Sequence, residues 1–335
     1  MEARKRFMSL DPTMLPDPPM PSYTFTVYHR DVFEKSKFKQ YDSLLENRLS
    51  RGHARASYLA LVLESKNAQG SEMRELVPKS TATHFAGANE RPVRVTFGCS
   101  KDQTGEQNFS ASTSGIVGLG RNVKYSLPSQ FGGNLMSMCL PSFYSGKSSI
   151  LSFHTSKWKR ATSAKLLPNH VWPSYYFVNL YKVFINDREV SVSPSWWNFK
   201  SGMLTGGIFV DTGTILTYFP HDFYIIFRDI FRAEVRDIHM VENPVESFDT
   251  CYNEGPNSRD LYFPVVTLYF GSVNSSTMLL LSQERVIMHY RGLYCLAFVG
   301  WDRDQSVLGM NQLQGVGLTF DTSANTLSFD LDACD

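Results

Sequence analysis

The sequence has no long apolar run, no excess of one charge and no cysteine motif of the kind that holds zinc. It contains no stretch of roughly 18 consecutive apolar residues, so we expect no transmembrane span. Its net charge is +1, with 33 basic and 32 acidic residues, and no basic run is dense enough to suggest nucleic acid as a partner. A membrane protein and a nucleic-acid-binding protein are therefore disfavoured.

Several common catalytic motifs are missing as well. No Gly-x-Ser-x-Gly elbow occurs, which argues against a serine hydrolase, and the eight histidines form no His-Glu-x-x-His pattern. Gly118 and Gly120 do not fit a dinucleotide fingerprint or a phosphate loop. None of the five cysteines lies in CxxC spacing, and their odd number leaves at least one unpaired. We expect no metal site and no cofactor.

The first residues favour no export signal. The basic opening is interrupted by Asp11, Pro12 and Asp17 before an apolar core can form, so we expect no signal peptide. Residues 1–22 are proline-rich, which predicts a flexible or extended tail. Two Asn-x-Ser triplets, at Asn108 and Asn274, would have meaning only in a secreted chain.

The composition that is present suits a large folded protein. With 335 residues, 42% hydrophobic and 13% aromatic, the chain can bury a sizeable core, and two domains are the natural expectation. Residues 40–66 show apolar residues at helical spacing with basic opposite faces, which predicts an amphipathic helix. Residues 67–92 have low hydrophobic content and no clear period, and we interpret them as a linker.

The most informative stretch is residues 206–220. A run of β-formers leads into Asp211, and a second apolar run follows, so the Asp lies at the tip of a loop between two strands. Gly213 lets the backbone bend and brings its N–H close to the carboxylate. The hydroxyls of Thr212 and Thr214 can hydrogen-bond the same oxygens. A solvated Asp-Thr-Gly turn is the plainer alternative, and the triplet alone is weak evidence.

The flanks of this loop carry a family resemblance. Val210-Asp211-Thr212-Gly213-Thr214 resembles the second active-site loop of pepsin-like aspartic proteases, and the longer stretch is similar to their plant nepenthesin-like branch. The resemblance covers roughly residues 93–335, with a weaker match at 23–65 that resembles a plant pro-segment; periodicity alone fits an ordinary surface helix equally well. It implies a mostly β, pepsin-like acid-protease fold with a complete C-terminal lobe and a truncated N-terminal lobe.

The segment after residue 92 resembles the later half of the N-terminal lobe. Val93–Cys99 is an alternating strand, and Gly115–Arg121 and Ser126–Gln130 follow it. Ile116-Val117-Gly118 is similar to the apolar-apolar-Gly element that crosses beneath a catalytic loop in each lobe, and Ser306–Gly309 supplies the same element later. We divide the chain into a pro-segment-like tail, helix and linker (1–92), an N-lobe remnant (93–172) and a C-terminal lobe (173–335).

The C-terminal half matches best. A strand over Tyr175–Leu180 opens it, a packing helix begins at Pro220, and Val316–Phe329 forms a closing hairpin. The sequences around Cys251 and Cys295 resemble the two halves of the C-lobe disulfide of the family. The resemblance also implies that Cys334 pairs with Cys99, which leaves Cys139 as a free, buried thiol.

Aspartic proteolysis needs a second carboxylate, because one Asp takes a proton from water while the other donates to the carbonyl oxygen. No other Asp-Thr-Gly or Asp-Ser-Gly occurs. In the C-terminal lobe, the glycine of the apolar-apolar-Gly element, Gly309, lies 98 residues after Asp211. The same spacing counted back from Gly118, the corresponding glycine of the N-terminal lobe, reaches Met20, which lies in a proline-rich stretch that cannot form the loop. The early N-terminal lobe, with its catalytic loop and flap tyrosine, is missing. A lone carboxylate stays ionised near neutral pH and is a poor general acid.

Four interpretations follow. The first is an aspartic endopeptidase family member that keeps only Asp211 and is inactive or impaired. The second is a non-catalytic, protein-binding homologue of the xylanase-inhibitor type. The third is a symmetric dimer in which two Asp211 loops meet, as in retroviral proteases. The fourth is a fragment of a full-length active protease. We expect a monomer.

If a full enzyme exists, the resemblance gives each loop residue a role. Asp211 would be one member of the dyad, Thr212 would link the two lobes, and Gly213 and Thr214 would fix the carboxylate. The partner would be an extended peptide or protein substrate. The family is secreted or vacuolar, although we see no address for that here. We also expect exposed apolar surface where the C-terminal lobe would meet the missing strands.

Overall fold

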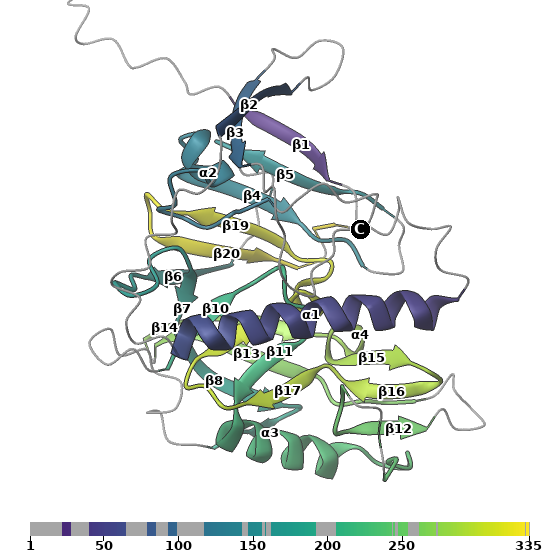
Figure 1. Cartoon of the computed structure of the whole chain (residues 1–335). Coiled ribbons are helices and arrows are strands. Elements are labelled where there is room, and N and C mark those ends of the chain that lie inside the picture. The colour runs from purple at the N-terminus through teal and green to yellow at the C-terminus, as the bar shows by residue number, and fades with distance from the viewer. Residues whose placement is uncertain are drawn as a thin grey trace, which may run out of the picture.

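The computed structural model describes residues 22–27, 40–64, 79–84, 93–98, 117–142, 147–155, 158, 162–191, 206–242, 244, 247–253, 261–272, 274–331 and 333–334. Most of the regular structure in these residues is β, as the sequence predicts (Figure 1). The proline-rich tail, Cys99 and Asn108 lie outside the described residues.

One sheet of eleven strands runs through the described part of the molecule. Its strands in spatial order are β1 (Tyr23–Val27), β5 (Ser149–Phe153), β4 (Leu135–Cys139), β19 (Gly317–Asp321), β20 (Thr326–Asp330), β6 (Thr162–Leu167), β7 (Tyr176–Val178), β10 (Ile208–Val210), β18 (Ser306–Leu308), β11 (Thr217–Pro220) and β17 (Phe298–Trp301). The closing hairpin β19–β20 lies between β4 and β6, so it joins N-lobe strands rather than ending the C-terminal lobe. The division at residue 172 stays a prediction, since one sheet contains strands from both sides of it.

Smaller sheets and helices complete the architecture. The smaller sheets are β14–β13–β8–β9 (Ser275–Leu281, Val266–Ser272, Leu180–Ile185, Arg188–Glu189), β12–β16–β15 (Cys251–Asn253, Leu293–Leu296, Ile287–Tyr290) and the pair β2–β3 (Lys79–His84, Val93–Gly98). The helices are α1 (Tyr41–Glu64), α2 (Leu127–Gln130), α3 (His221–Glu234), α4 (Gln283–Val286) and a 3-10 turn at Met310–Leu313. Strand β2 lies within the segment that we interpreted as a linker, where a short polar strand shows no periodicity. Strand β1 was not expected either.

Helix α3 begins directly after Pro220, as the apolar stripe predicts. Phe223, Phe227 and Phe231 recur every four residues and are buried. The ring of Phe219 on β11 lies 4.8 Å from that of Phe223 and 5.4 Å from that of Phe227. The helix therefore covers one side of the strand that follows the Asp211 loop and holds it in place.

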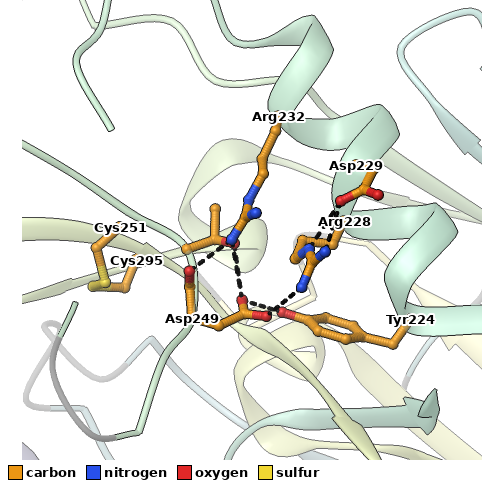
Figure 2. A network of polar contacts seen from close by, with 8 residues as sticks. Tyr224, Arg228, Asp229, Arg232, Asp249, Cys251 and Cys295 are labelled. Carbon is orange, nitrogen blue, oxygen red and sulfur yellow. Dashed lines mark hydrogen bonds and ion pairs between the residues drawn. A yellow bond between two sulfur atoms is a disulfide. The ribbon is translucent and has the colours of Figure 1, made fainter. Parts of the chain in front are cut away.

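A polar network ties α3 to the Cys251–Cys295 disulfide strand (Figure 2). The Tyr224 hydroxyl donates to Asp249 Oδ1 at 2.5 Å, and Arg228 Nη1 donates to Oδ2 of the same carboxylate at 3.1 Å. Arg232 donates to the Asp249 carbonyl oxygen at 2.7 Å. Burial, with the neighbouring Asp249 charge, raises the pKa of Tyr224, so its hydroxyl remains a donor.

The disulfide pattern differs in part from the family expectation. Cys251 and Cys295 are bonded as expected, at a directly paired position of β12 and β16. Cys334, however, is bonded to Cys139, so the expected pairing with Cys99 is wrong. The topology explains the difference. Cys139 faces Gly317 across β4 and β19, and the chain returns along β20 to bring residue 333 against Gly317.

The two apolar-apolar-Gly elements adopt different structures. In the second, Val307 and Leu308 are fully buried on β18, which pairs in parallel with β10. In the first, residues 117–120 form no strand, and Val117 is 64% exposed. The interpretation of residues 116–118 as a buried crossing element is therefore wrong for the described part of that segment. No described strand and loop stands there for the element to cross beneath.

The two glycines of these elements provide a matched test. A Cβ on Gly309 would stand 2.2 Å from the Leu216 carbonyl oxygen, whereas a Cβ on Gly118 would meet nothing within 4 Å. Because the Leu216 contact is with backbone, we expect Gly309→Ala to destabilise the protein by about 3 kcal/mol. Gly118→Ala should be neutral or stabilise it by up to about 1 kcal/mol. Urea unfolding of both variants checks this, and equal midpoints would contradict it.

Candidate active-site loop

Asp211 lies in a tight turn between two buried strands. Strand β10 delivers it, and its backbone N–H donates to the Leu308 carbonyl oxygen at 3.1 Å. The N–H of Thr214 then donates back to the Asp211 carbonyl oxygen at 3.2 Å and closes the turn. The apolar run of β10 is buried on both faces, as in central strands generally. The carboxylate therefore projects from a rigid base.

Two neighbours within the turn hold the carboxylate. The Thr214 hydroxyl donates to Asp211 Oδ2 at 2.6 Å, and the Gly213 N–H donates to Oδ1 at 3.3 Å. Both contacts are those that the sequence predicts. The Thr212 side chain makes no hydrogen bond to another element among the described residues, and its role as a link between two lobes of a full enzyme stays a prediction.

The nearest charge to Asp211 is a cation from α1. Arg55 Nε donates to Asp211 Oδ2 at 3.0 Å, and Nη2 approaches Oδ1 at 3.5 Å. The Asp211 side chain is only 12% exposed and that of Arg55 34%, so the pair is partly shielded from water. Burial acts to lower the pKa of Arg55, but the charge and hydrogen bond of Asp211 outweigh it and raise that pKa. Arg55 therefore remains a cation and neutralises the carboxylate.

The whole middle of α1 rests on the Asp211 loop. A Cβ on Gly52 would lie 3.3 Å from Ile215, so the missing side chain allows the helix to approach closely. At the next residue, the ring of His53 is hydrogen-bonded to the Tyr218 hydroxyl at 3.1 Å. Figure 1 shows the helix crossing in front of β10 and β11. The residues of α1 in this buried cluster are Leu45, Leu49, Ala56 and Leu59.

This packing corrects one expectation from the sequence. We expected exposed apolar surface where the missing strands would lie against the C-terminal lobe. Around the loop that expectation is wrong, because Ile215, Leu216 and Tyr218 are 5%, 2% and 6% exposed beneath α1. The helix thus supplies the apolar cover that the lobe needs there.

Polar contacts fix α1 at each end. Near its start, Asp42 accepts from the Arg291 N–H at 3.1 Å, and Glu46 pairs with the Arg291 guanidinium at 2.8 Å. Near its end, Arg303 Nε donates to the Ala60 carbonyl oxygen at 3.0 Å. Since these contacts lie on opposite sides of Arg55, they set the position of Arg55 over the carboxylate.

Two tyrosines surround the ion pair. The Tyr58 ring lies 5.4 Å from the Arg55 guanidinium carbon. Burial raises the pKa of Tyr175 to about 12, and the nearby Arg55 partly offsets this. The Tyr175 ring packs at a tilt against that of Phe209 on β10, with ring centroids 4.9 Å apart. The Tyr175 hydroxyl therefore stays protonated near neutral pH and provides no second anion.

No carboxylate among the described residues bonds to Asp211. Its side-chain partners there are Arg55, Gly213 and Thr214. The described residues also contain no cluster of three His, Cys, Asp or Glu side chains that could hold a metal ion. In an aspartic dyad, two carboxyl groups share one proton. A carboxylate that is paired with a guanidinium has no such proton to share, because an Arg side chain stays protonated in proteins.

Deeper residues support the loop from below. Thr217 Oγ1 donates to Gln312 Oε1 at 2.7 Å, and it accepts from the Gly309 N–H at 3.0 Å. Sequence reasoning missed Thr217, Gln312 and Arg55. The glycine inside the amphipathic helix, Gly52, was a usable sign of close packing for that helix. Nothing in the sequence pointed to Gln312.

The comparisons with known proteins agree with this architecture. The family described as "Xylanase inhibitor N-terminal" matches residues 30–153, and "Xylanase inhibitor C-terminal" matches residues 175–330. Nepenthesin-1 of Nepenthes gracilis is 28% identical over 243 residues, covering 72% of this chain and 54% of the relative. Aspartyl protease AED3 of Arabidopsis thaliana is 29% identical, covering 71% and 53%. The chain belongs to the plant nepenthesin-like branch of the pepsin-like aspartic proteases.

Solved structures show the same fold. The structure titled "Crystal structure of edgp" aligns with a TM-score of 0.62 at 23% identity, covering 72% of this chain and 66% of that one. Basic 7S globulin from soybean aligns with a TM-score of 0.58 at 22% identity, covering 72% and 65%. The nepenthesin-like chain spans about half the length of the curated relatives it matches. Among its described residues, no helix is long and apolar enough to cross a bilayer.

The ion pair gives the second prediction. Arg55→Met keeps the aliphatic length but leaves the half-buried Asp211 without its cation, so we expect a loss of about 1–2 kcal/mol of unfolding free energy. Arg51→Met is the matched control, since Arg51 lies on the same helix and its guanidinium donates to Asn47 of that helix. In a chain that already carries Asp211→Asn, Arg55→Met should lower the unfolding free energy by less than it does in the wild type. Additive effects in this urea-unfolding cycle would contradict a direct Arg55–Asp211 coupling.

Proposed function

We propose that this chain is a nepenthesin-like family member that does not hydrolyse peptide bonds. The observation that carries the proposal is the pairing of Asp211 with Arg55, in place of a second aspartate. An active dyad needs one ionised and one protonated carboxyl group sharing a proton. The guanidinium of Arg55 gives up no proton and so cannot act as a general acid, and no other acid stands on the other side of the loop in the described residues.

The position of α1 supports the same proposal. An extended substrate peptide of an aspartic protease would lie over the catalytic loop, between two lobes. Here α1 covers that loop through Gly52, His53 and Arg55, and the described chain offers no second catalytic loop opposite it. A peptide could reach Asp211 only after α1 had left, and would then contact one wall of a cleft.

Hydrolysis of an acid-denatured protein at low pH tests the proposal. We expect the purified chain to show no pepstatin-sensitive cleavage, and Asp211→Asn to give the same trace as wild type. An active nepenthesin assayed in parallel is the positive control: it shows that the substrate can be cleaved and that pepstatin inhibits the cleavage.

Pepstatin-sensitive cleavage by the wild type that Asp211→Asn abolishes would overturn the proposal. A rate that rises with the square of protein concentration would then indicate a two-chain dyad. Loss of activity by one mixed-in Asp211→Asn chain would point the same way. Transcripts that encode further N-lobe sequence between residues 67 and 92 would instead identify a longer, active protease.

A second candidate function is binding of another protein. It is favoured by the two family descriptions, which are the halves of a xylanase inhibitor and together match residues 30–153 and 175–330. Under this candidate, the partners are secreted glycoside hydrolases, and the lone Asp211 is a structural residue.

A pull-down with purified microbial xylanases tests this candidate. We expect retention of a xylanase together with slower xylan hydrolysis, unchanged in Asp211→Asn. Retention by a chain unfolded by reduction would show non-specific adhesion. No retention across xylanases of different fold families would contradict the candidate while leaving the non-proteolytic proposal intact.

A further inference from the structure

The Asn274-Ser275-Ser276 triplet lies at the tip of a tight hairpin. Strands β13 and β14 pair as far as Ser272 and Ser275, and Asn274 lies in the turn between them. Asn274 and Ser276 are both exposed. An Asn-x-Ser triplet with an accessible amide and hydroxyl is an acceptor for an N-linked oligosaccharide in the secretory pathway. Asn108, in the other triplet, lies outside the described residues.

The hairpin is held to the segment before β8 through Gly271, one residue pair before the turn. The N–H of Gly271 donates to the Asn179 carbonyl oxygen at 2.8 Å, and the Asn179 side chain donates to the Gly271 carbonyl oxygen at 2.6 Å. Gly271 has φ of 112°, a conformation that suits glycine. Asn274 therefore presents its amide to solvent on a fixed support.

The disulfides indicate the compartment in which such a modification takes place. Two disulfides, Cys139–Cys334 and Cys251–Cys295, join residues 195 and 44 positions apart. Disulfides of this kind form in the endoplasmic reticulum lumen and persist outside the cytosol. A chain that folds with both bonds passes the site of asparagine glycosylation.

The neighbouring strand gives the modification a physical use. β14 is the edge of its four-stranded sheet, and its outward residues Ser276, Met278 and Leu280 are exposed, the last two by 46% and 40%. Met278 pairs with Tyr269, whose ring lies 5.5 Å from that of Phe184. An exposed apolar edge strand favours aggregation, and natural proteins cover such edges.

We propose that Asn274 carries an N-linked oligosaccharide that shields the outer face of β14. In the transfer step, the Asn274 side-chain nitrogen attacks C1 of the first sugar of a polyprenyl-diphosphate-linked oligosaccharide. The N–C1 bond forms, the bond from C1 to the diphosphate oxygen breaks, and the amide loses a proton. The lipid diphosphate leaves, and no oxidation or reduction occurs.

In vitro translation of the full chain with microsomes, behind a cleavable secretory leader, tests the modification. We expect the imported, protease-protected chain to carry an endoglycosidase-sensitive mobility shift that Ser276→Ala removes. Ser275→Ala is the matched control, because it keeps the Asn-x-Ser pattern, and Ser276→Thr should keep or raise occupancy. Asn108→Gln in every variant isolates the Asn274 signal. Imported chain without a shift at Asn274 would overturn the proposal.

Enzymatic removal of the oligosaccharide tests the shielding. We expect the deglycosylated protein to aggregate faster in light scattering, and Met278→Lys with Leu280→Lys to restore the slower rate. Equal aggregation with and without the oligosaccharide would refute shielding of β14. The outcome is independent of protease activity, since the hairpin lies outside the Asp211 loop.

Discussion

The ion pair between Arg55 and Asp211 is the contact on which the arrangement of this molecule depends. Placing a carboxylate where it is only 12% exposed costs free energy unless hydrogen bonds and a countercharge compensate for the lost water. The turn supplies two donors, and Arg55 supplies the charge from a helix 156 residues earlier in the chain. That long-range pair joins α1 to the loop between β10 and β11. It also removes the chemical condition for an aspartic dyad, which is a second carboxyl group at the same place.

The rest of the packing is consistent with this role of α1. The C-terminal lobe has a complete crossing element, with Gly309 pressed against the Leu216 backbone, whereas Val117 and Gly118 of the first element stand open. The lobe therefore keeps its own core, and among the described residues no second Asp loop stands opposite it. Helix α1 fills part of that place with Leu45, Leu49 and Leu59, and it uses Gly52 to come within contact of Ile215. Family resemblance places a pro-segment here, and the structure describes a cover that is built into the core.

Much of the fold could be predicted from the sequence because local patterns carried it. Three local patterns predict the structure of their own segments: the run of β-formers before Asp211, the Phe stripe of α3 and the alternating residues of the closing hairpin. Gly213 and Thr214 were predicted as donors to Asp211 since a turn of that composition brings them within reach. The Cys251–Cys295 pair followed from the family resemblance.

What could not be predicted depends on contacts between distant segments. Arg55 is one of several basic residues on α1, and only the docked position of the helix shows which of them meets Asp211. The partner of Cys334 depends on the placement of β19 beside β4, which brings Cys139 rather than Cys99 to the chain end. Strand β2 is polar and short, and its pairing with β3 has no periodic trace in the sequence.

Hydrogen exchange of the α1 backbone at neutral pH is the most direct test of the account. Most of the stability of a helix in a protein comes from tertiary packing, so slow exchange in the 24-residue α1 requires packing against the lobe. The account predicts that amides of residues 45–59 are protected to the same degree as those of α3. It also predicts that Arg55→Met lowers the protection of α1 while β10 and β18 stay protected. Rapid exchange throughout α1 in the wild-type chain, with the lobe still protected, would contradict the central claim.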